Sequence, residues 1–144
     1  MKGDLKMNPN DARIKRIYTR RVGSQILDQS LKIVDPFEVV VEWEAGSVKT
    51  ADGGPWEITI VALDITAGSA APAAFNQNIA GNWAAGDGHS LGGGDWHADP
   101  STDAVLTITP PAGSEGHIYR YTAMLVAQVD IVSFVESPLF CITA

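Results

Sequence analysis

Residues 37–44 read FEVVVEWE, and this stretch decides the fold class. Every second position carries a large apolar side chain, at Phe37, Val39, Val41 and Trp43. The positions between them are mostly acidic, at Glu38, Val40, Glu42 and Glu44. Because successive side chains of a β-strand point to opposite faces, the alternation predicts a half-buried strand with an acidic outer face.

Similar short stretches lie on both sides of this strand. Runs rich in β-branched and aromatic residues recur at 26–34, 56–65, 103–109, 117–129, 131–135 and 139–143. Turn signals separate them, among them Asp35-Pro36 and the proline- and glycine-containing run 110–114. This spacing predicts an all-β fold, an antiparallel β-sandwich of about seven to nine strands, with a closed barrel as the alternative.

One of these runs resembles part of a known family. Residues 107–127 read TITPPAGSEGHIYRYTAMLVA and resemble the corner between strands E and F of a fibronectin type III or other immunoglobulin-like domain. In such domains a proline–glycine turn precedes a strand with an inward tyrosine. VVVEW at 39–43 is similar to their strand B with its core tryptophan. The resemblance implies an immunoglobulin-like sandwich over roughly 25–144, in which Tyr119 or Tyr121 bonds back to the turn.

The chain departs from that family in three features. The stretch 66–103, between the presumed strands C and E, is much longer than usual, and the basic N-terminus has no counterpart. Cys141 is the only cysteine, so the inter-sheet disulfide of antibody domains cannot form. Domains of this architecture bind or build more often than they catalyse, and the resemblance therefore implies a non-catalytic role.

The charges divide the chain in two. Residues 1–21 hold seven Lys or Arg and two Asp, a net charge of +5, whereas the remaining 123 residues carry −12. We therefore predict a basic N-terminal arm, 1–23, and an acidic β-sandwich domain, 24–144. An acidic domain repels DNA and anionic lipid, which argues against a nucleic-acid partner and favours a protein.

The arm carries an apolar stripe beside its bases. Asn8-Pro9 is typical of a helix start and the apolar residues that follow have helical spacing, so we expect a short helix, with an extended strand as the alternative. The stripe should dock on an acidic sheet surface of the same chain or of another copy; a solvated terminus is the competing interpretation. The residues of this interaction arm are Arg13, Ile14, Ile17, Tyr18, Arg20 and Arg21.

Residues 66–103 form a Gly/Ala-rich insertion that holds seven of the chain's 14 glycines. Loops of this length in a compact domain are usually either functional or disordered, and the apolar residues of this one argue against full disorder. The end of the preceding strand is apolar on both sides because Val61, Leu63 and Ile65 alternate with inward residues. We expect the apolar residues of the insertion to cover those three side chains.

The insertion also supplies ligand candidates. Aromatic faces stack on sugar rings beside polar amides, and the residues that could do so are Trp83, Trp96 and Asn76. Calcium prefers carboxylate oxygens, which are available at Asp87, Asp95 and Asp99. A zinc site would need His89 and His97. A protein contact is the remaining interpretation, since Trp is enriched in interface hot spots.

No catalytic motif is present in the sequence: it lacks a nucleophile elbow, an HExxH helix and a phosphate loop. No apolar run reaches the roughly 18 residues of a membrane span. The first 16 residues lack the apolar stretch of a secretory signal, which predicts a cytoplasmic protein or one exported by a non-Sec route.

We therefore expect a non-enzymatic structural or protein-interaction subunit that forms a homo-oligomer or larger assembly and has no cofactor. A carbohydrate- or calcium-binding module built on 66–103 is the alternative.

Overall fold

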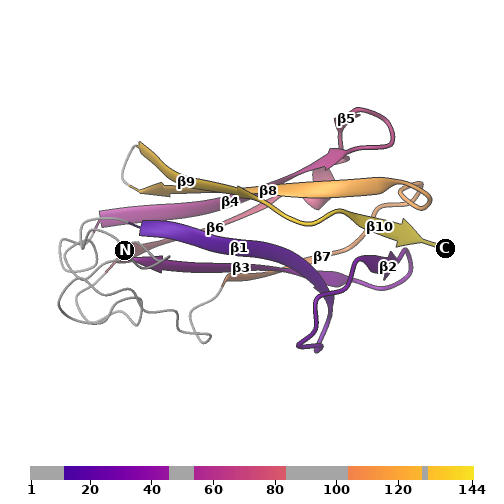
Figure 1. The fold of residues 1–144 in the computed structure, drawn as a ribbon, viewed down its shortest axis with the longest axis horizontal. Coiled ribbons are helices and arrows are strands. Elements are labelled where there is room, and N and C mark those ends of the chain that lie inside the picture. Colours follow the sequence, from indigo (N-terminus) through magenta and orange to yellow (C-terminus); the bar gives the residue numbers. More distant parts are fainter. Residues whose placement is uncertain (1–11, 46–53, 84–103, 128–129) are drawn as a thin grey trace, which may run out of the picture.

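The computed structural model describes residues 12–45, 54–83, 104–127 and 130–144. They form strands that pack as two sheets, one above the other in Figure 1. The predicted all-β sandwich is confirmed. Ten strands are present in these ranges, rather than seven to nine, because two short strands and one strand inside the expected insertion add to the count.

Sheet A contains three strands in the order β1-β3-β7. They are β1 (Ala12–Arg21), β3 (Phe37–Ala45) and β7 (Ala104–Ile108). Both pairings are antiparallel. The alternation in residues 37–44 places Phe37, Val39, Val41 and Trp43 in the core, as predicted.

Sheet B contains the remaining seven strands. They are β2 (Ser30–Lys32), β4 (Gly54–Asp64), β5 (Ser69–Ala70), β6 (Gln77–Trp83), β8 (Ile118–Ala127), β9 (Asp130–Glu136) and β10 (Phe140–Thr143). β4 and β8 pair antiparallel at its centre, Trp56–Asp64 against Tyr119–Ala127. β5 and β6 share the other side of β4, β9 and β10 share the other side of β8, and β2 runs parallel to β10.

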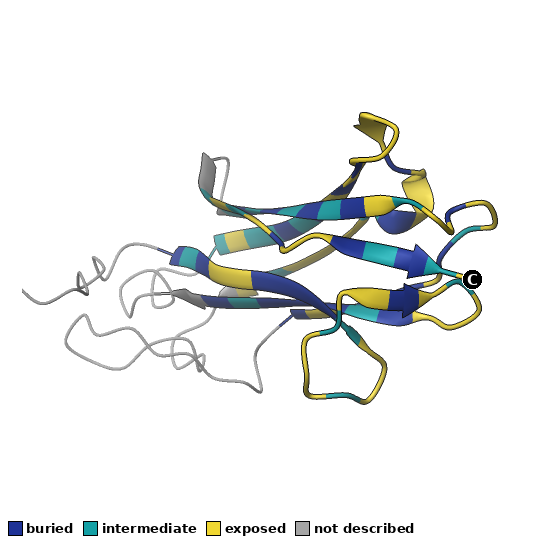
Figure 2. Ribbon diagram, turned by 45° about the vertical axis from the view of Figure 1, so that its right-hand side comes forward, coloured by how far each residue is buried: buried dark blue, intermediate teal, exposed yellow. Residues whose placement is uncertain are grey.

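Aromatic side chains fill the space between the sheets at one end. Phe140 stacks with Tyr119 and Tyr121 at ring-centroid distances of 5.7 and 5.4 Å, and Phe75 lies 4.7 Å from Tyr119. Phe37 of sheet A contacts Phe75 and Phe140 at 6.3 and 5.8 Å. Figure 2 shows the result as buried and exposed bands that alternate along the strands. The two sheets are therefore joined by a common apolar core.

The helix expected in the N-terminal arm is wrong for the described residues, because 12–21 form strand β1. Ile14 and Ile17 are buried in the core although three positions separate them. A β-bulge between Ile14 and Arg16 inserts Lys15 as one extra residue, which brings Ile17 back to the inward face. The helix-like spacing is therefore produced by the bulge, and β1 is an integral strand of the sandwich rather than a separate arm.

The expected loop at 66–103 is ordered secondary structure over its first half. Strand β5, the 3-10 turn η1 (Ala73–Phe75) and strand β6 lie within it, and β6 pairs with β4 over seven residues. Residues 84–103 lie outside the described part of the chain. Within the described ranges, nothing covers Val61, Leu63 and Ile65, which remain 38–39% exposed.

Candidate interaction surfaces

The bases of β1 form ion pairs with the acidic face of β3 in the same chain. Arg20 Nε lies 2.9 Å from Glu38 Oε1, with the two side chains 14% and 15% exposed. Arg16 Nη2 lies 2.9 Å from Glu42 Oε2, and its guanidinium carbon is 4.4 Å from the centre of the Tyr18 ring. Antiparallel pairing causes this arrangement, because it sets Arg20 opposite Glu38 and Arg16 opposite Glu42. The outer face of sheet A thus carries charges that are paired within the chain, together with the apolar side chains of Tyr18, Val40 and Val105, of which Val105 is 42% exposed.

The predicted interaction arm is accordingly docked on its own domain. Ile14, Ile17 and Tyr18 are buried, and Arg13 is half-buried opposite Glu44 in the register. The apolar stripe therefore packs in the chain's own fold, which is the intramolecular form of the predicted docking.

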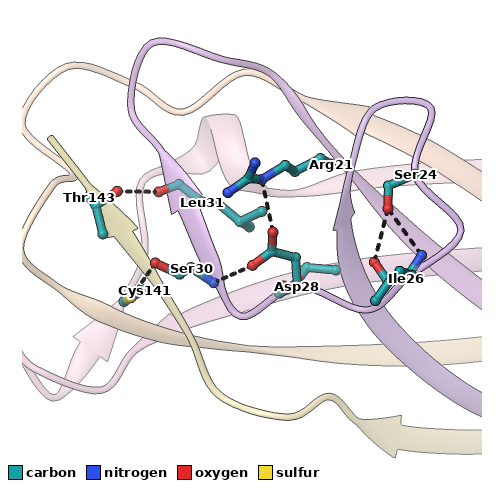
Figure 3. A network of polar contacts seen from close by, with 9 residues as sticks. Arg21, Ser24, Ile26, Asp28, Ser30, Leu31, Cys141 and Thr143 are labelled. Carbon is teal, nitrogen blue, oxygen red and sulfur yellow. Dashed lines mark hydrogen bonds and ion pairs between the residues drawn. The ribbon is translucent and has the colours of Figure 1, made fainter.

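The loop between β1 and β2 is fixed by polar contacts (Figure 3). Arg21 Nε lies 2.9 Å from Asp28 Oδ2, and Asp28 Oδ1 accepts a hydrogen bond from the Ser30 backbone N–H at 2.9 Å. The Thr19 hydroxyl donates to the Asp28 carbonyl at 2.6 Å. These contacts tie the ends of the loop together, and at its exposed tip the Ile26 N–H donates to the Ser24 hydroxyl at 3.1 Å.

The outer face of sheet B differs from that of sheet A. It presents an apolar surface that we call the apolar face, made of Val61, Leu63, Ile65, Ile118, Met124, Phe134 and Leu139. Phe134 on β9 is 63% exposed and lies opposite Met124 of β8. The ladders set Thr122, Arg120 and Glu136 among these apolar side chains.

The charges on the outer face of sheet B are few. Arg120 Nη2 lies 3.1 Å from Glu136 Oε2, and the Asn78 amide donates to Glu57 Oε2 at 2.8 Å. Arg120 lies opposite Leu63 in the ladder between β4 and β8. The apolar face is thus nearly neutral, in contrast to the chain's net charge of −7.

A hollow of about 190 Å³ adjoins the apolar face where β10 meets β8. Its lining residues are Gln29, Ile118, Leu139, Phe140 and Cys141. Ile118 and Cys141 are register partners and share the outer side of sheet B. The hollow is open to solvent and its walls are mostly apolar.

The tyrosine corner expected from the sequence is present at Tyr119. Its hydroxyl donates to the Ser114 carbonyl at 2.8 Å, whereas the Tyr121 hydroxyl donates to the Phe75 carbonyl at 2.8 Å. Burial raises the pKa of both phenols, and the negative charges of Asp64 and Glu115 raise that of Tyr119 further. Neither hydroxyl is available as an acid or base near neutral pH.

A carboxylate–imidazole pair lies beside this corner. Asp64 Oδ2 is 2.7 Å from His117 Nδ1, and Asp64 Oδ1 accepts the Ala67 N–H at 2.9 Å. Burial would raise the pKa of Asp64, but the hydrogen bonds from Ala67, His117 and Thr66, together with the charge of His117, lower it below the usual value. These contacts join the turn after β4 to the start of β8, so the pair has a structural role that accounts for it fully.

Of the predicted sugar and metal candidates, only Asn76 has a described side chain. Asn76 Oδ1 accepts the Ala62 N–H at 3.0 Å, so its oxygen holds the chain beside β4. Trp83 ends β6 opposite Gly54. Trp96, Asp87, Asp95 and Asp99 lie outside the described residues, as do His89 and His97. In the ranges that the structure describes, no group of three or more His, Cys, Asp or Glu could hold a metal ion.

An aromatic pair near the other end of sheet B was not singled out by the sequence. The rings of Trp43 and Trp56 lie 4.7 Å apart, and a Cβ on Gly81 would come within 2.7 Å of the Trp56 ring. A hollow of about 480 Å³ lies beside Trp56, Glu57 and Asn82. Trp56 is packed between Trp43 and the Gly81 backbone, so its ring serves the fold rather than forming an open sugar platform.

Phe134 and the hollow were also missed in the sequence. The alternation in IVSFV at 131–135 was available as a signal, because it places Phe134 on the face opposite Ser133 and Val135. The hollow had no such signal, since Gln29 is brought beside Ile118 and Leu139 only by the parallel pairing of β2 with β10.

Comparisons with known proteins bear on the fold alone. No family model matches the chain, and no curated protein matches its sequence. A solved structure assigned as a β-galactosidase from Bacteroides fragilis is similar with a TM-score of 0.50 and 10% sequence identity. The match covers 88% of this chain and 17% of that protein, so the chain spans about a sixth of its length. At this identity the similarity supports a β-sandwich and says nothing about activity.

Among the described residues, no helix has the length and hydropathy needed to cross a membrane.

Proposed function

We propose that this chain is a non-catalytic β-sandwich module that functions in protein–protein assembly, and that its docking surface is the apolar face of sheet B. The observation that carries the proposal is the contrast between the two outer faces. Among the described residues, sheet A carries charges paired within the chain and one exposed large apolar side chain, Val105, whereas sheet B carries several, such as Val61, Leu63 and Phe134. Apolar surface gains free energy on burial in proportion to its area, so this face has the larger driving force for association.

The proposal moves the assembly surface away from the N-terminal arm. Ile14, Ile17 and Tyr18 are buried in their own domain, so their burial cannot also drive binding to another copy. Arg16 and Arg20 are similarly occupied by Glu42 and Glu38. In this proposal the N-terminal strand stabilises sheet A and does not itself contact another copy.

We also infer that the sandwich is immunoglobulin-like. β1, β3 and β7 take the places of strands A, B and E, and β4, β8 and β9 those of C, F and G, with β6 beside β4. The hydrogen bond from Tyr119 to Ser114 supports this assignment.

The test compares the binding of a hydrophobic fluorescent dye by three forms of the dilute chain. The wild type should bind the dye, and a variant with Val61→Thr, Leu63→Thr and Phe134→Ser should lose most of the signal. A control variant with Val105→Thr should keep the dye signal, because Val105 lies on sheet A, outside the apolar face. Its side chain is exposed to a similar extent, 42%. Equal dye binding by all three folded forms would overturn the proposal.

The carbohydrate or calcium alternative is tested by titration of sugars and Ca²⁺ with tryptophan fluorescence as the readout. We expect no saturable response. A saturable response that Trp83→Ala or Trp96→Ala abolishes would replace the assembly proposal with a ligand-binding module.

A further inference from the structure

The geometry points to a second copy of this chain as the occupant of the apolar face. We propose a two-fold dimer, packed sheet B against sheet B, in which Phe134 of each copy enters the 190 Å³ hollow of the other. This inference rests on the proposed function, since it names the partner of the same surface.

The face carries both a projecting side chain and a socket for it. Phe134 is 63% exposed, the largest exposed fraction on the apolar face. The shallow hollow of about 190 Å³ beside Ile118 and Leu139 can receive one face of an aromatic ring, and its lining is almost wholly apolar apart from Gln29. The Gln29 amide is already bonded to the Leu139 carbonyl at 2.6 Å, so burial of the hollow leaves that donor satisfied.

The positions of the two features suit a two-fold axis. Phe134 lies opposite Met124 of β8, and the hollow adjoins Ile118 at the start of the same strand. The two are thus six residues apart along β8, roughly 20 Å at 3.3 Å per residue. An axis that crosses β8 midway between them, near Tyr121, places each Phe134 over the hollow of the other copy. Such an interface is isologous and closes as a dimer.

The charges near this axis complement their symmetry-related copies. Arg120 and Glu136 lie near the level of Tyr121, on β8 and β9. The axis brings Arg120 of one copy towards Glu136 of the other, so the pair can exchange or share partners. Two chains with a net charge of −7 repel each other, and the nearly neutral apolar face is where this repulsion is weakest.

The area is sufficient for a reversible dimer. Four adjacent strands about 4.8 Å apart and nine paired residues at about 3.3 Å define a face of about 600 Å² per copy. The total of about 1,200 Å² lies at the lower end of specific protein interfaces. We therefore expect association in the micromolar range rather than a permanent dimer.

Sedimentation equilibrium of the full chain, from roughly 1 to 500 µM, tests the dimer. Phe134→Ala removes the projecting ring and Ile118→Trp fills the hollow, and each should weaken association at least tenfold. Ile26→Ala is the matched control: Ile26 is 75% exposed but lies on the loop between β1 and β2, and its loss should leave association unchanged. Circular dichroism checks that each variant is folded.

A charge exchange gives a second, independent readout. Glu136→Arg alone should weaken association, and the double variant Arg120→Glu with Glu136→Arg should restore it to within about threefold. A wild-type chain that stays monomeric at every concentration, or a dimer unaffected by both Phe134→Ala and Ile118→Trp, would overturn the inference. A monomer that still binds the hydrophobic dye would leave the proposed function intact, whereas a monomer without dye binding would remove both.

Discussion

At the scale of single residues, one end of the sandwich is held by buried polar side chains. Tyr119, Tyr121 and Asp64 are each at most 6% exposed, and each has a hydrogen-bond partner. A buried polar group without a partner costs about 1–3 kcal/mol, so these bonds specify which loops meet at this end. Tyr119 joins β8 to the turn that precedes it, and Asp64 joins the turn after β4 to His117.

Tyr119→Phe should destabilise the fold by about 1–3 kcal/mol, because it leaves the Ser114 carbonyl without the hydroxyl donor. Urea unfolding should show a lower midpoint with an unchanged slope. Ile118→Val, at an exposed position one residue earlier, is the control and should change the midpoint little. An unaltered midpoint in Tyr119→Phe would show that the corner bond contributes nothing.

The lowered pKa of Asp64 predicts an acid-labile contribution to stability. A carboxyl whose pKa is lower in the folded state stabilises the fold above its unfolded pKa of about 3.9, and that stability disappears as the pH falls through the folded pKa. Urea midpoints of the wild type should therefore fall more steeply below about pH 4 than those of Asp64→Asn. His117→Gln should have an intermediate slope, since the Ala67 bond remains. Identical slopes in all three proteins would contradict this.

At the scale of elements, β1 shows how one extra residue changes a strand. With Lys15 set aside, Ile14, Ile17 and Thr19 face inward and Arg16 and Arg20 face outward in regular alternation. The bulge therefore keeps the inward residues in register with β3 and places an exposed lysine on a sheet edge. A charge and a bulge on an edge strand both oppose unwanted pairing.

Deletion of Lys15 should be tolerated, with a loss of stability below about 1 kcal/mol, because it removes the bulge and leaves the alternation intact. Deletion of Tyr18 should prevent folding, because every residue on one side of the gap would move to the opposite face. Thermal unfolding followed by circular dichroism distinguishes the two. The account of the bulge fails if Lys15 deletion is as damaging as Tyr18 deletion.

At the scale of the whole molecule, the N-terminal strand is part of the core. β1 pairs with β3 over most of its length, and the Ile14 N–H bonds to the Ser133 hydroxyl of β9 in the other sheet at 2.9 Å. β1 therefore closes one side of the sandwich, and its removal would unpair one edge of β3 and take away the contacts of β1 with β8 and β9.

A chain that begins at Ser24 should not fold cooperatively. It loses Ile14 and Ile17, which are buried to 4% and 1% exposure, and burial of each such side chain contributes about 1.5–3 kcal/mol. The two together account for about 3–6 kcal/mol, a large part of a total stability of only about 5–15 kcal/mol, and the backbone pairing of β1 with β3 is lost as well. Calorimetry should show no unfolding transition, whereas a sharp transition would mean that β1 is a dispensable arm.

The sequence predicted the strands whose alternation is undisturbed. The stretch 37–44, the run 56–64 and the start of β8 at Tyr119 are regular, so a period of two identifies both the strand and its inward face. The sequence of β1 suggests a helix because the bulge at Lys15 converts a spacing of two into three. The sequence of β6 suggests a loop because Gln77–Trp83 is rich in Asn, Gly and Ala, residues with low strand propensity.

The amino-acid sequence alone determined the class of fold, the inward residues of the regular strands and the segregation of charge, because these follow from local periodicity and composition. Tertiary structure decided where the charges are neutralised and which face remains apolar. Arg16 bonds to Glu42, 26 residues away in the chain, and Gln29 bonds to Leu139, 110 residues away. Both contacts are brought about by the pairing of neighbouring strands. Such contacts depend on strand order and register, which no local pattern specifies.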